Sequence, residues 1–129
     1  MPELISGPSH VDKAGGRPRF CDTYMFPARP GKSHLQFSHM RCAGGWAEPE
    51  ETPASGLDKY ILVLRGLLRV EHDGGVLDVR AGQGVVIRAG ERVRSSTPGP
   101  AGAEYIVVCL LGFPREADHW GRESLGGEG

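Results

Sequence analysis

The sequence predicts an all-β protein, because its turn-forming residues are abundant and its apolar segments recur at a regular spacing. Glycine accounts for 20 of the 129 residues and proline for 10, and both residues interrupt helices. Between these residues, short segments rich in β-branched side chains follow one another from residue 35 to residue 111. About seven short strands at such a spacing are typical of a β-sandwich or β-barrel. Because 39% of the residues are apolar, the chain can fill one core.

Residues 1–34 are expected to form an irregular N-terminal arm. Repeated glycines and prolines interrupt any period there, although residues 20–26 could form a strand. The next segment, residues 35–42, alternates from one side chain to the next, and alternation predicts a strand. Residues 46–51 follow a Gly-Gly turn and form a possible strand that is weakened by its proline.

The middle of the chain predicts strands joined by tight turns. Residues 59–70 form a β-rich segment that is interrupted by Gly66. Residues 73–75, Asp-Gly-Gly, favour a hairpin because glycine adopts the positive φ that such turns need. The remaining strands are expected at residues 76–80, 85–88, 93–97 and 105–111. The predicted barrel domain spans residues 35–114, and residues 115–129 are expected to form a C-terminal tail.

The charge and the cysteines limit the possible functions. A net charge of −1 provides no basic field that could hold nucleic acid. The longest apolar segment, residues 105–111, is far shorter than the roughly 20 residues that span a bilayer. The chain has an odd number of cysteines, and their spacing is not that of a metal site: Cys21, Cys42 and Cys109. This pattern favours reduced thiols. We therefore expect a cytoplasmic protein that binds neither nucleic acid nor membranes.

The spacing of the turns resembles that of the cupin superfamily, whose members are small jelly-roll β-barrels. Gly82 and Gly90 stand at the two glycine positions of the second cupin motif, with Arg88 in place of its proline. Gly66 closes the first motif, and the match covers about residues 37–111. This resemblance implies a cupin-type antiparallel β-barrel, or jelly roll, with the N-terminal arm outside it.

Within the superfamily, residues 46–97 are most similar to the cupin domain of ethanolamine-utilisation proteins. Those proteins also have a tryptophan twenty residues before the closing glycine, as Trp46 stands before Gly66 here, and they also lack the two-histidine signature. Small cupins commonly pair, so the resemblance implies a homodimer in which the N-terminal arm could cross to the partner.

The positions at which cupins hold a metal carry other residues in this chain. The resemblance places Lys59 at the metal-binding glutamate and Val93 at the last histidine. The paired histidines fall on Thr52 with Ala54 or on Pro53 with Ser55. A transition metal needs imidazole and carboxylate ligands that converge on one point. We therefore expect no metal and no cofactor.

Lys59 is the main candidate for a catalytic role. If the resemblance holds, Lys59, Ile61 and Val63 face the barrel interior, because alternate strand residues share a face. A cation there would anchor a substrate carboxylate or enolate. The alternative is that Lys59 lies at the start of its strand with its ammonium group in solvent. Glu50 could pair with Lys59 and act as a general acid or base, or could lie in a solvated loop.

His39 is the third catalytic candidate. It shares one side of its strand with Leu35 and Phe37, so we expect it to face an apolar interior and to move protons together with Glu50. The alternative is a hydrogen-bonded core histidine. Five further residues are candidates for substrate binding, although solvent exposure or ordinary packing would explain each of them: Glu48, Ser95, Thr97, Tyr105 and Trp46.

The leading functional hypothesis is an enzyme that acts by proton transfer on a small polar or anionic metabolite without a metal. Isomerisation, elimination and cyclisation belong to this class, so the enzyme would be an isomerase, lyase or cyclase. One alternative is a non-catalytic module that binds a small molecule in its barrel. The ethanolamine-utilisation resemblance also suggests a purely structural partner in a larger assembly.

Overall fold

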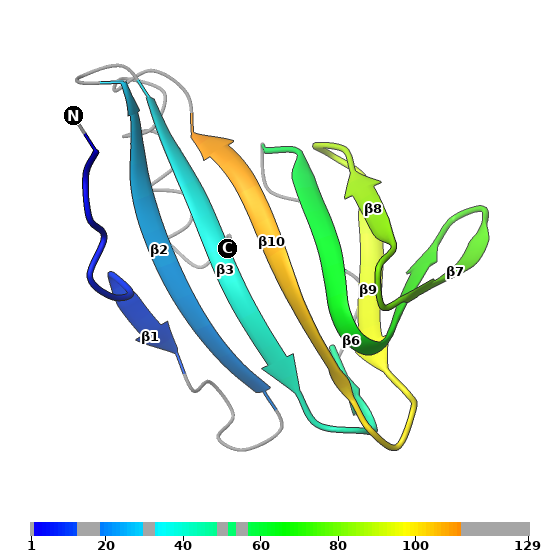
Figure 1. Ribbon diagram of the computed structural model, residues 1–129. Helices are drawn as coiled ribbons and strands as arrows, with labels where there is room; N and C mark the ends of the chain where they lie inside the picture. The colour runs from blue at the N-terminus through cyan, green and yellow to red at the C-terminus, as the bar shows by residue number, and fades with distance from the viewer. Residues whose placement is uncertain (1, 13–18, 30–32, 49–51, 54–56, 112–129) are drawn as a thin grey trace.

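The computed structural model describes residues 2–12, 19–29, 33–48, 52–53 and 57–111. All of its regular elements within these residues are strands, which form one curled antiparallel sheet (Figure 1). The strands are β1 (His10–Asp12), β2 (Arg19–Arg29), β3 (Ser33–Cys42), β4 (Trp46–Ala47), β5 (Thr52–Pro53), β6 (Lys59–His72), β7 (Gly75–Arg80), β8 (Gly84–Ile87), β9 (Arg92–Thr97) and β10 (Ala103–Leu111). The all-β prediction is confirmed. Over this described part of the chain, no helix is long and apolar enough to cross a membrane.

The sheet has the strand order β1-β2-β3-β10-β6-β9-β4, and β6 is its pivot. The first half of β6 pairs with β10 and β8, and its second half pairs with β7 and β9. The change of partners coincides with a register shift opposite Glu104 and with the positive φ of Gly66. A bulge of this kind bends a strand and increases its twist. One long strand therefore belongs to both walls of the barrel, and β9 passes behind β6 in Figure 1.

The N-terminal segment is more regular than the sequence suggested. Its described part contributes β1 and β2, and β2 pairs with β3 from Arg19 to Arg29. The possible strand at residues 20–26 is therefore present and longer than expected. Pro27 lies beside the register shift near the end of this pairing, where a missing N–H donor does little harm to a sheet.

One face of the curled sheet, here called the inner face, carries the core. Ile61 and Val63 are buried before the bulge, whereas Leu68 and Val70 are buried after it. The buried positions change from odd to even numbers because the bulge adds one residue. The opposite side of the sheet is called the outer face. The core consists of Cys21, Met40, Cys42, Ile61, Val63, Leu68, Val70, Val79, Ile87, Val93, Ala103 and Tyr105.

Candidate functional site in the barrel

Lys59 lies on the inner face of the sheet at the start of β6. It shares this face with the buried Ile61 and Val63, and its side chain is partly exposed. Cys109 of β10 is buried on the same face. Burial raises the pKa of the Cys109 thiol, and the positive charge of Lys59 opposes that rise. The ammonium group of Lys59 is therefore close enough to Cys109 to act electrostatically on its thiol.

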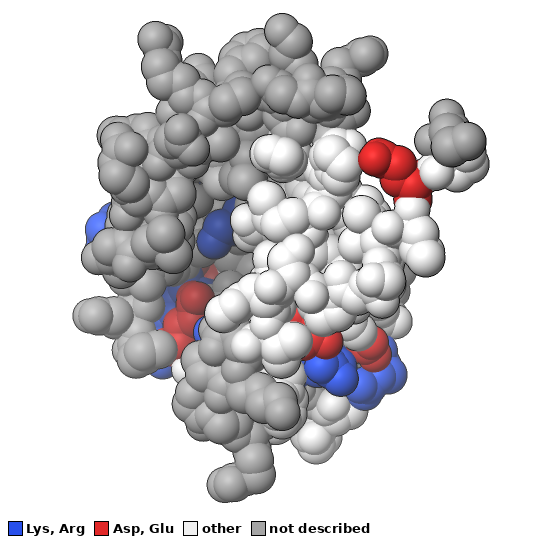
Figure 2. Space-filling view, turned by 90° about the vertical axis from the view of Figure 1, so that its left-hand side faces the viewer, with Lys and Arg blue, Asp and Glu red and all other residues white. Residues whose placement is uncertain are grey.

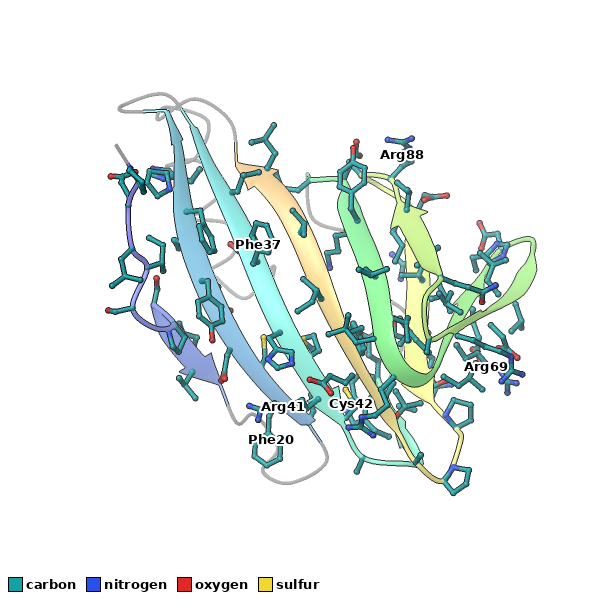
Figure 3. The ribbon with its side chains drawn as sticks, viewed as in Figure 1. Phe20, Phe37, Arg41, Cys42, Arg69 and Arg88 are labelled. Carbon is teal, nitrogen blue, oxygen red and sulfur yellow. The ribbon has the colours of Figure 1, made fainter. Side chains whose placement is uncertain are left out.

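The turn after β8 fixes the position at which β6 begins. The Oδ1 atom of Asp58 accepts a hydrogen bond of 2.8 Å from the backbone N–H of Ala89. Its Oδ2 atom lies 3.3 Å from a guanidinium nitrogen of Arg88, which points away from the sheet at this end (Figure 3). The backbone of Lys59 is also held in register with Ile87. These contacts position the lysine before any ligand arrives.

A second polar group lies on the inner face where β3 ends and β10 begins. Tyr105 is 4% exposed, and its hydroxyl lies 3.8 Å from the Sγ atom of Cys42. Burial raises the pKa of Tyr105 well above its usual value, so the phenol stays protonated at neutral pH. At about 3.4 Å per residue, the four residues from Tyr105 to Cys109 separate this group from Lys59 by about 14 Å along β10.

Arg19 belongs to this second group and is a residue that sequence reasoning missed. It is opposite Cys42 in the β2–β3 pairing, so its side chain is on the inner face. Its charge lowers the pKa of both Cys42 and Tyr105, against the larger effect of burial. The Nε atom of Arg19 is buried, and the described residues provide it with no hydrogen-bond partner. Only the pairing register shows this placement, because Arg19 precedes the segment that the sequence predicts as a strand.

The predicted substrate-binding residues of β4 and β9 form a structural cluster. The Oε1 atom of Glu48 accepts a hydrogen bond of 2.7 Å from the backbone N–H of Ser95. Thr97 is fully buried and donates a hydrogen bond of 2.7 Å to the carbonyl oxygen of Ala43. Trp46 pairs with Thr97 and packs against the core. These contacts hold β4 against β9, and a role in substrate binding stays a prediction for all of them.

His39 does not join Lys59. On β3 the inner face carries the buried Met40 and Cys42, so His39 lies on the outer face. Its Nε2 atom is 2.6 Å from Oε2 of Glu104, which also lies on the outer face. The expectation that His39 faces the interior is therefore wrong, because the outer face of β3 carries the apolar Leu35 and Phe37 beside His39, so that polarity alone indicates the wrong face.

The catalytic trio of Lys59, Glu50 and His39 is consequently not assembled in the described structure. The sheet itself separates His39 from Lys59. Glu50 lies outside the described residues. Of the predicted catalytic residues, Lys59 alone is placed on the inner face by the described part of the chain.

The residues at the cupin metal positions do not fit a transition metal. Val93, at the position of the last histidine, is 9% exposed and apolar. Its cross-strand neighbour is Thr52, and Lys59, at the position of the glutamate, carries a positive charge. Among the described residues, no group of three His, Cys, Asp or Glu side chains is placed to hold a metal ion.

Purified protein is therefore expected to contain far less than one equivalent of zinc, iron or manganese after dialysis against EDTA. The physical reason is that Lys59 and Val93 provide no ligand atom for a divalent cation at neutral pH. Elemental analysis by plasma mass spectrometry provides the measurement. One tightly bound equivalent that survives the chelator would contradict this expectation.

The interaction between His39 and Glu104 predicts a pH-dependent contribution to stability. The hydrogen bond from His39 holds the pKa of Glu104 below its usual value of 4.5, and Arg65 adds to the effect. A lowered folded-state pKa stabilises the fold above the unfolded-state pKa, and this stabilisation is lost as the pH falls through the folded-state pKa. Glu104→Gln should lower the free energy of unfolding by roughly 1 kcal/mol at pH 7, as for other partly exposed ion pairs.

Urea unfolding of the wild type and of Glu104→Gln at pH 7 and at pH 3 tests this prediction. The difference between the two proteins should become smaller as the pH falls from 7 to 3, because the stabilisation is lost as the pH falls through the lowered folded-state pKa of Glu104. A difference of the same size at both pH values would show that Glu104 acts through packing rather than through its charge.

Comparison with solved structures identifies the architecture. No known family profile matches the sequence, and no curated protein does. An RmlC-like cupin from Shewanella frigidimarina superposes with a TM-score of 0.62 at 14% identity, over 78% of this chain and 82% of that one. The chain has the cupin fold. The predicted resemblance to this superfamily is thereby confirmed for the fold.

Two further structures share this cupin fold. EutQ from Clostridium difficile, an ethanolamine-utilisation protein, matches with a TM-score of 0.52 at 19% identity, over 84% of this chain and 82% of EutQ. The polyketide cyclase RemF from Streptomyces resistomycificus matches with a TM-score of 0.58 at 18% identity, over 87% of this chain and 74% of RemF. At these identities the likeness shows the fold and not the activity.

Proposed function

We propose that this cupin binds a small anionic metabolite on the inner face of its barrel and acts on it by proton transfer. The observation that carries the proposal is the position of Lys59, a partly exposed lysine on the otherwise apolar first half of the inner face of β6. A lysine on an apolar face loses part of its hydration, and an anionic ligand beside it would compensate for that loss. We expect the protein to act in the cytoplasm, where its three free cysteines stay reduced.

Lys59 is suited to hold an anion because its charge is partly withdrawn from solvent. A charged hydrogen bond strengthens as the surrounding dielectric constant falls. The buried Ile61 and Val63 lower the dielectric constant around Lys59. In a proton transfer beside a carbonyl group, a base accepts the proton as the C–H bond breaks, and negative charge develops on the carbonyl oxygen. Glu50 is the candidate that the sequence provides for this base. The Lys59 ammonium group would stabilise that oxygen, which lowers the barrier to isomerisation, elimination or cyclisation.

The group around Arg19 supports an anionic ligand independently. A buried donor without a partner costs about 1–3 kcal/mol, and the Nε atom of Arg19 is such a donor within the described residues. A carboxylate oxygen would satisfy it. The protonated hydroxyl of Tyr105 lies in the same group and can donate a hydrogen bond to the same ligand.

A non-catalytic small-molecule-binding module is the second candidate. The observation that favours it is the placement of His39 on the outer face, which removes the imidazole that would have accepted a proton. Binding through Lys59 would still occur in such a module. The two candidates therefore differ in proton transfer and not in the ligand.

Solvent deuterium exchange separates the two candidates. The protein is incubated in D₂O with a panel of small carboxylates, including acetate, malonate, pyruvate and oxaloacetate, and the C–H signals are followed by NMR. The enzyme hypothesis predicts that at least one acidic C–H exchanges faster than in buffer, and that Lys59→Met lowers this rate by about 10²–10³-fold, as does the loss of other groups that stabilise a developing oxyanion. Binding without exchange supports the module, and neither binding nor exchange contradicts both.

A further inference from the structure

Arg19 and Glu48 bring opposite charges to the same end of the inner face. Arg19 is opposite the buried Cys42 in the β2–β3 pairing, so its side chain lies on this face. Glu48 is two residues after Trp46, which packs against the core, and its backbone N–H donates a hydrogen bond of 3.0 Å to the carbonyl oxygen of Ser95. Side chains alternate along an extended segment, so Glu48 lies on the inner face as well. In Figure 2, blue and red atoms both lie in the hollow on the left-hand side, which is the inner side of the sheet.

The turn between β3 and β4 holds Glu48 near Cys42. Thr97 of β9 donates a hydrogen bond of 2.7 Å to the carbonyl oxygen of Ala43, which follows Cys42. Two residues earlier on β9, the backbone N–H of Ser95 donates a hydrogen bond of 2.7 Å to Oε1 of Glu48. At about 3.4 Å per residue, these two contacts are about 7 Å apart along β9. The Glu48 carboxylate is therefore fixed beside the end of β3 that carries Cys42.

The electrostatic effects of the two residues agree with this placement. Burial has the largest effect on the pKa of Cys42 and on the pKa of Tyr105, and it raises both. The positive charge of Arg19 lowers both pKa values, and the negative charge of Glu48 raises both. The Cys42 thiol and the Tyr105 hydroxyl, which lie 3.8 Å apart, are therefore within electrostatic range of both charged groups.

Neither charge has an ion-pair partner in the described part of the chain. No hydrogen bond or ion pair reaches the guanidinium group of Arg19 there, and its Nε atom is buried. Glu48 accepts its hydrogen bond from a neutral backbone N–H. Arg94 donates a hydrogen bond of 2.7 Å to the backbone carbonyl oxygen of Glu48, and its guanidinium group lies 3.9 Å from the carboxylate of Glu71. The charges of Arg19 and Glu48 are thus both available to a ligand.

We propose that this end of the inner face binds an amino carboxylic acid, a zwitterion at neutral pH, with its carboxylate on Arg19 and its ammonium group on Glu48. A guanidinium group can donate two parallel hydrogen bonds to one carboxylate, and such a ligand would provide the acceptor that the buried Nε atom lacks. The protonated hydroxyl of Tyr105 can donate a third hydrogen bond. Glu48 would repel a ligand that is only anionic, whereas an ammonium group would form an ion pair with it. This inference rests on the proposed function for the carboxylate, and the charge of Glu48 adds the amino group.

The proposed zwitterion site is separate from Lys59. Tyr105 and Cys109, which lies on the same face as Lys59, are about 14 Å apart along β10, so one small amino acid cannot contact both ends. Lys59→Met is therefore expected to leave the binding of an amino acid at Arg19 unchanged. This independence allows one set of titrations to test the two sites separately.

Calorimetric titration of the wild-type protein compares amino acids with the carboxylic acids that lack the amino group, such as glycine with acetate and γ-aminobutyrate with butyrate. At least one amino acid should bind roughly tenfold to more than a hundredfold more tightly than its partner, which is the value of one charged hydrogen bond. Amino acids that bind no more tightly than their partners would overturn this inference. If the carboxylates still bind and Lys59→Met weakens them, the proposed function stands without it. If no carboxylate and no amino acid binds, both are overturned.

Matched variants then locate the two charges, and circular dichroism checks that each variant remains folded. Glu48→Gln keeps the Oε1 acceptor for the N–H of Ser95 and removes the charge, so it should lower the affinity for the amino acid to that of its partner carboxylate. Arg19→Met should weaken the binding of both ligands. Glu91→Gln is the control, because Oε1 of Glu91 accepts a hydrogen bond of 2.6 Å from the backbone N–H of Arg88 in an exposed turn, and it should change neither affinity. Equal losses in Glu48→Gln and Glu91→Gln, or a folded Glu48→Gln that retains the preference for the amino acid, would also overturn the inference.

Discussion

Replacement of Gly102 by alanine should destabilise this protein by about 3 kcal/mol or more. Gly102 is buried where β3, β10 and β6 meet, and its φ of +70° is in the left-handed region. A Cβ atom there would overlap the backbone carbonyl oxygen of Cys42. The left-handed conformation costs a non-glycine residue about 1–2 kcal/mol, and overpacking against the rigid backbone adds about 1–3 kcal/mol. Urea unfolding monitored by circular dichroism measures the sum.

Gly90→Ala provides the matched control. Gly90 has a φ of +88°, and a Cβ atom there would meet nothing within 4 Å. This variant should therefore lose only about 1–2 kcal/mol, from the backbone conformation alone. Equal losses in the two variants would mean that the close approach of Gly102 to Cys42 contributes nothing to stability.

Lys59→Met should lower the affinity for an anionic ligand by roughly tenfold to more than a hundredfold. One charged hydrogen bond is worth about 1.5–3 kcal/mol, and methionine removes it while it keeps a similar volume on the inner face. Stability should be unchanged or slightly improved, because the variant no longer brings a positive charge beside Ile61 and Val63. Calorimetric titration with the tightest-binding carboxylate of the panel, together with thermal melts, measures both effects.

Arg80→Met removes the same charge from the exposed hairpin of β7 and serves as the control. It should leave the affinity for the carboxylate unchanged. If Lys59 only extends into solvent from the end of its strand, Lys59→Met will resemble Arg80→Met, with stability changes within about 0.5 kcal/mol and no effect on the ligand. That result would place the binding site elsewhere.

The strands could be predicted from the sequence because glycine residues mark the turns between them. Gly75 and Gly82 have positive φ angles at turns that the sequence predicts, and the strands of the second half of the chain lie close to their expected limits. The fold followed from the spacing of these turns. The strands of the N-terminal segment were only partly predicted. Pairing with β3 stabilises β2 despite its proline, and the local strand propensity of the sequence does not indicate that pairing.

The site could be predicted only where the resemblance to the cupin motif indicated which face of a strand is the inner one. The match between this segment and the first cupin motif assigned Lys59 to the inner face. The alternation of buried and exposed residues along β6 agrees with that placement. His39 was assigned to the wrong face because β3 has apolar side chains on both sides, with Met40 on the inner face and Phe37 on the outer face. The two faces of such a strand differ in what covers them, and a single sequence does not contain that information.

The most direct test of the account is a map of the carboxylate-binding site by NMR. The ¹H–¹⁵N spectrum is recorded while the tightest-binding carboxylate of the panel is added to the wild-type protein. The account predicts that the largest shifts cluster at Lys59, Ile61 and Cys109 on the inner face, and that Lys59→Met abolishes them. Shifts that cluster on the outer face or on the β7 hairpin, with Lys59 and Cys109 unaffected, would contradict the assignment of the site.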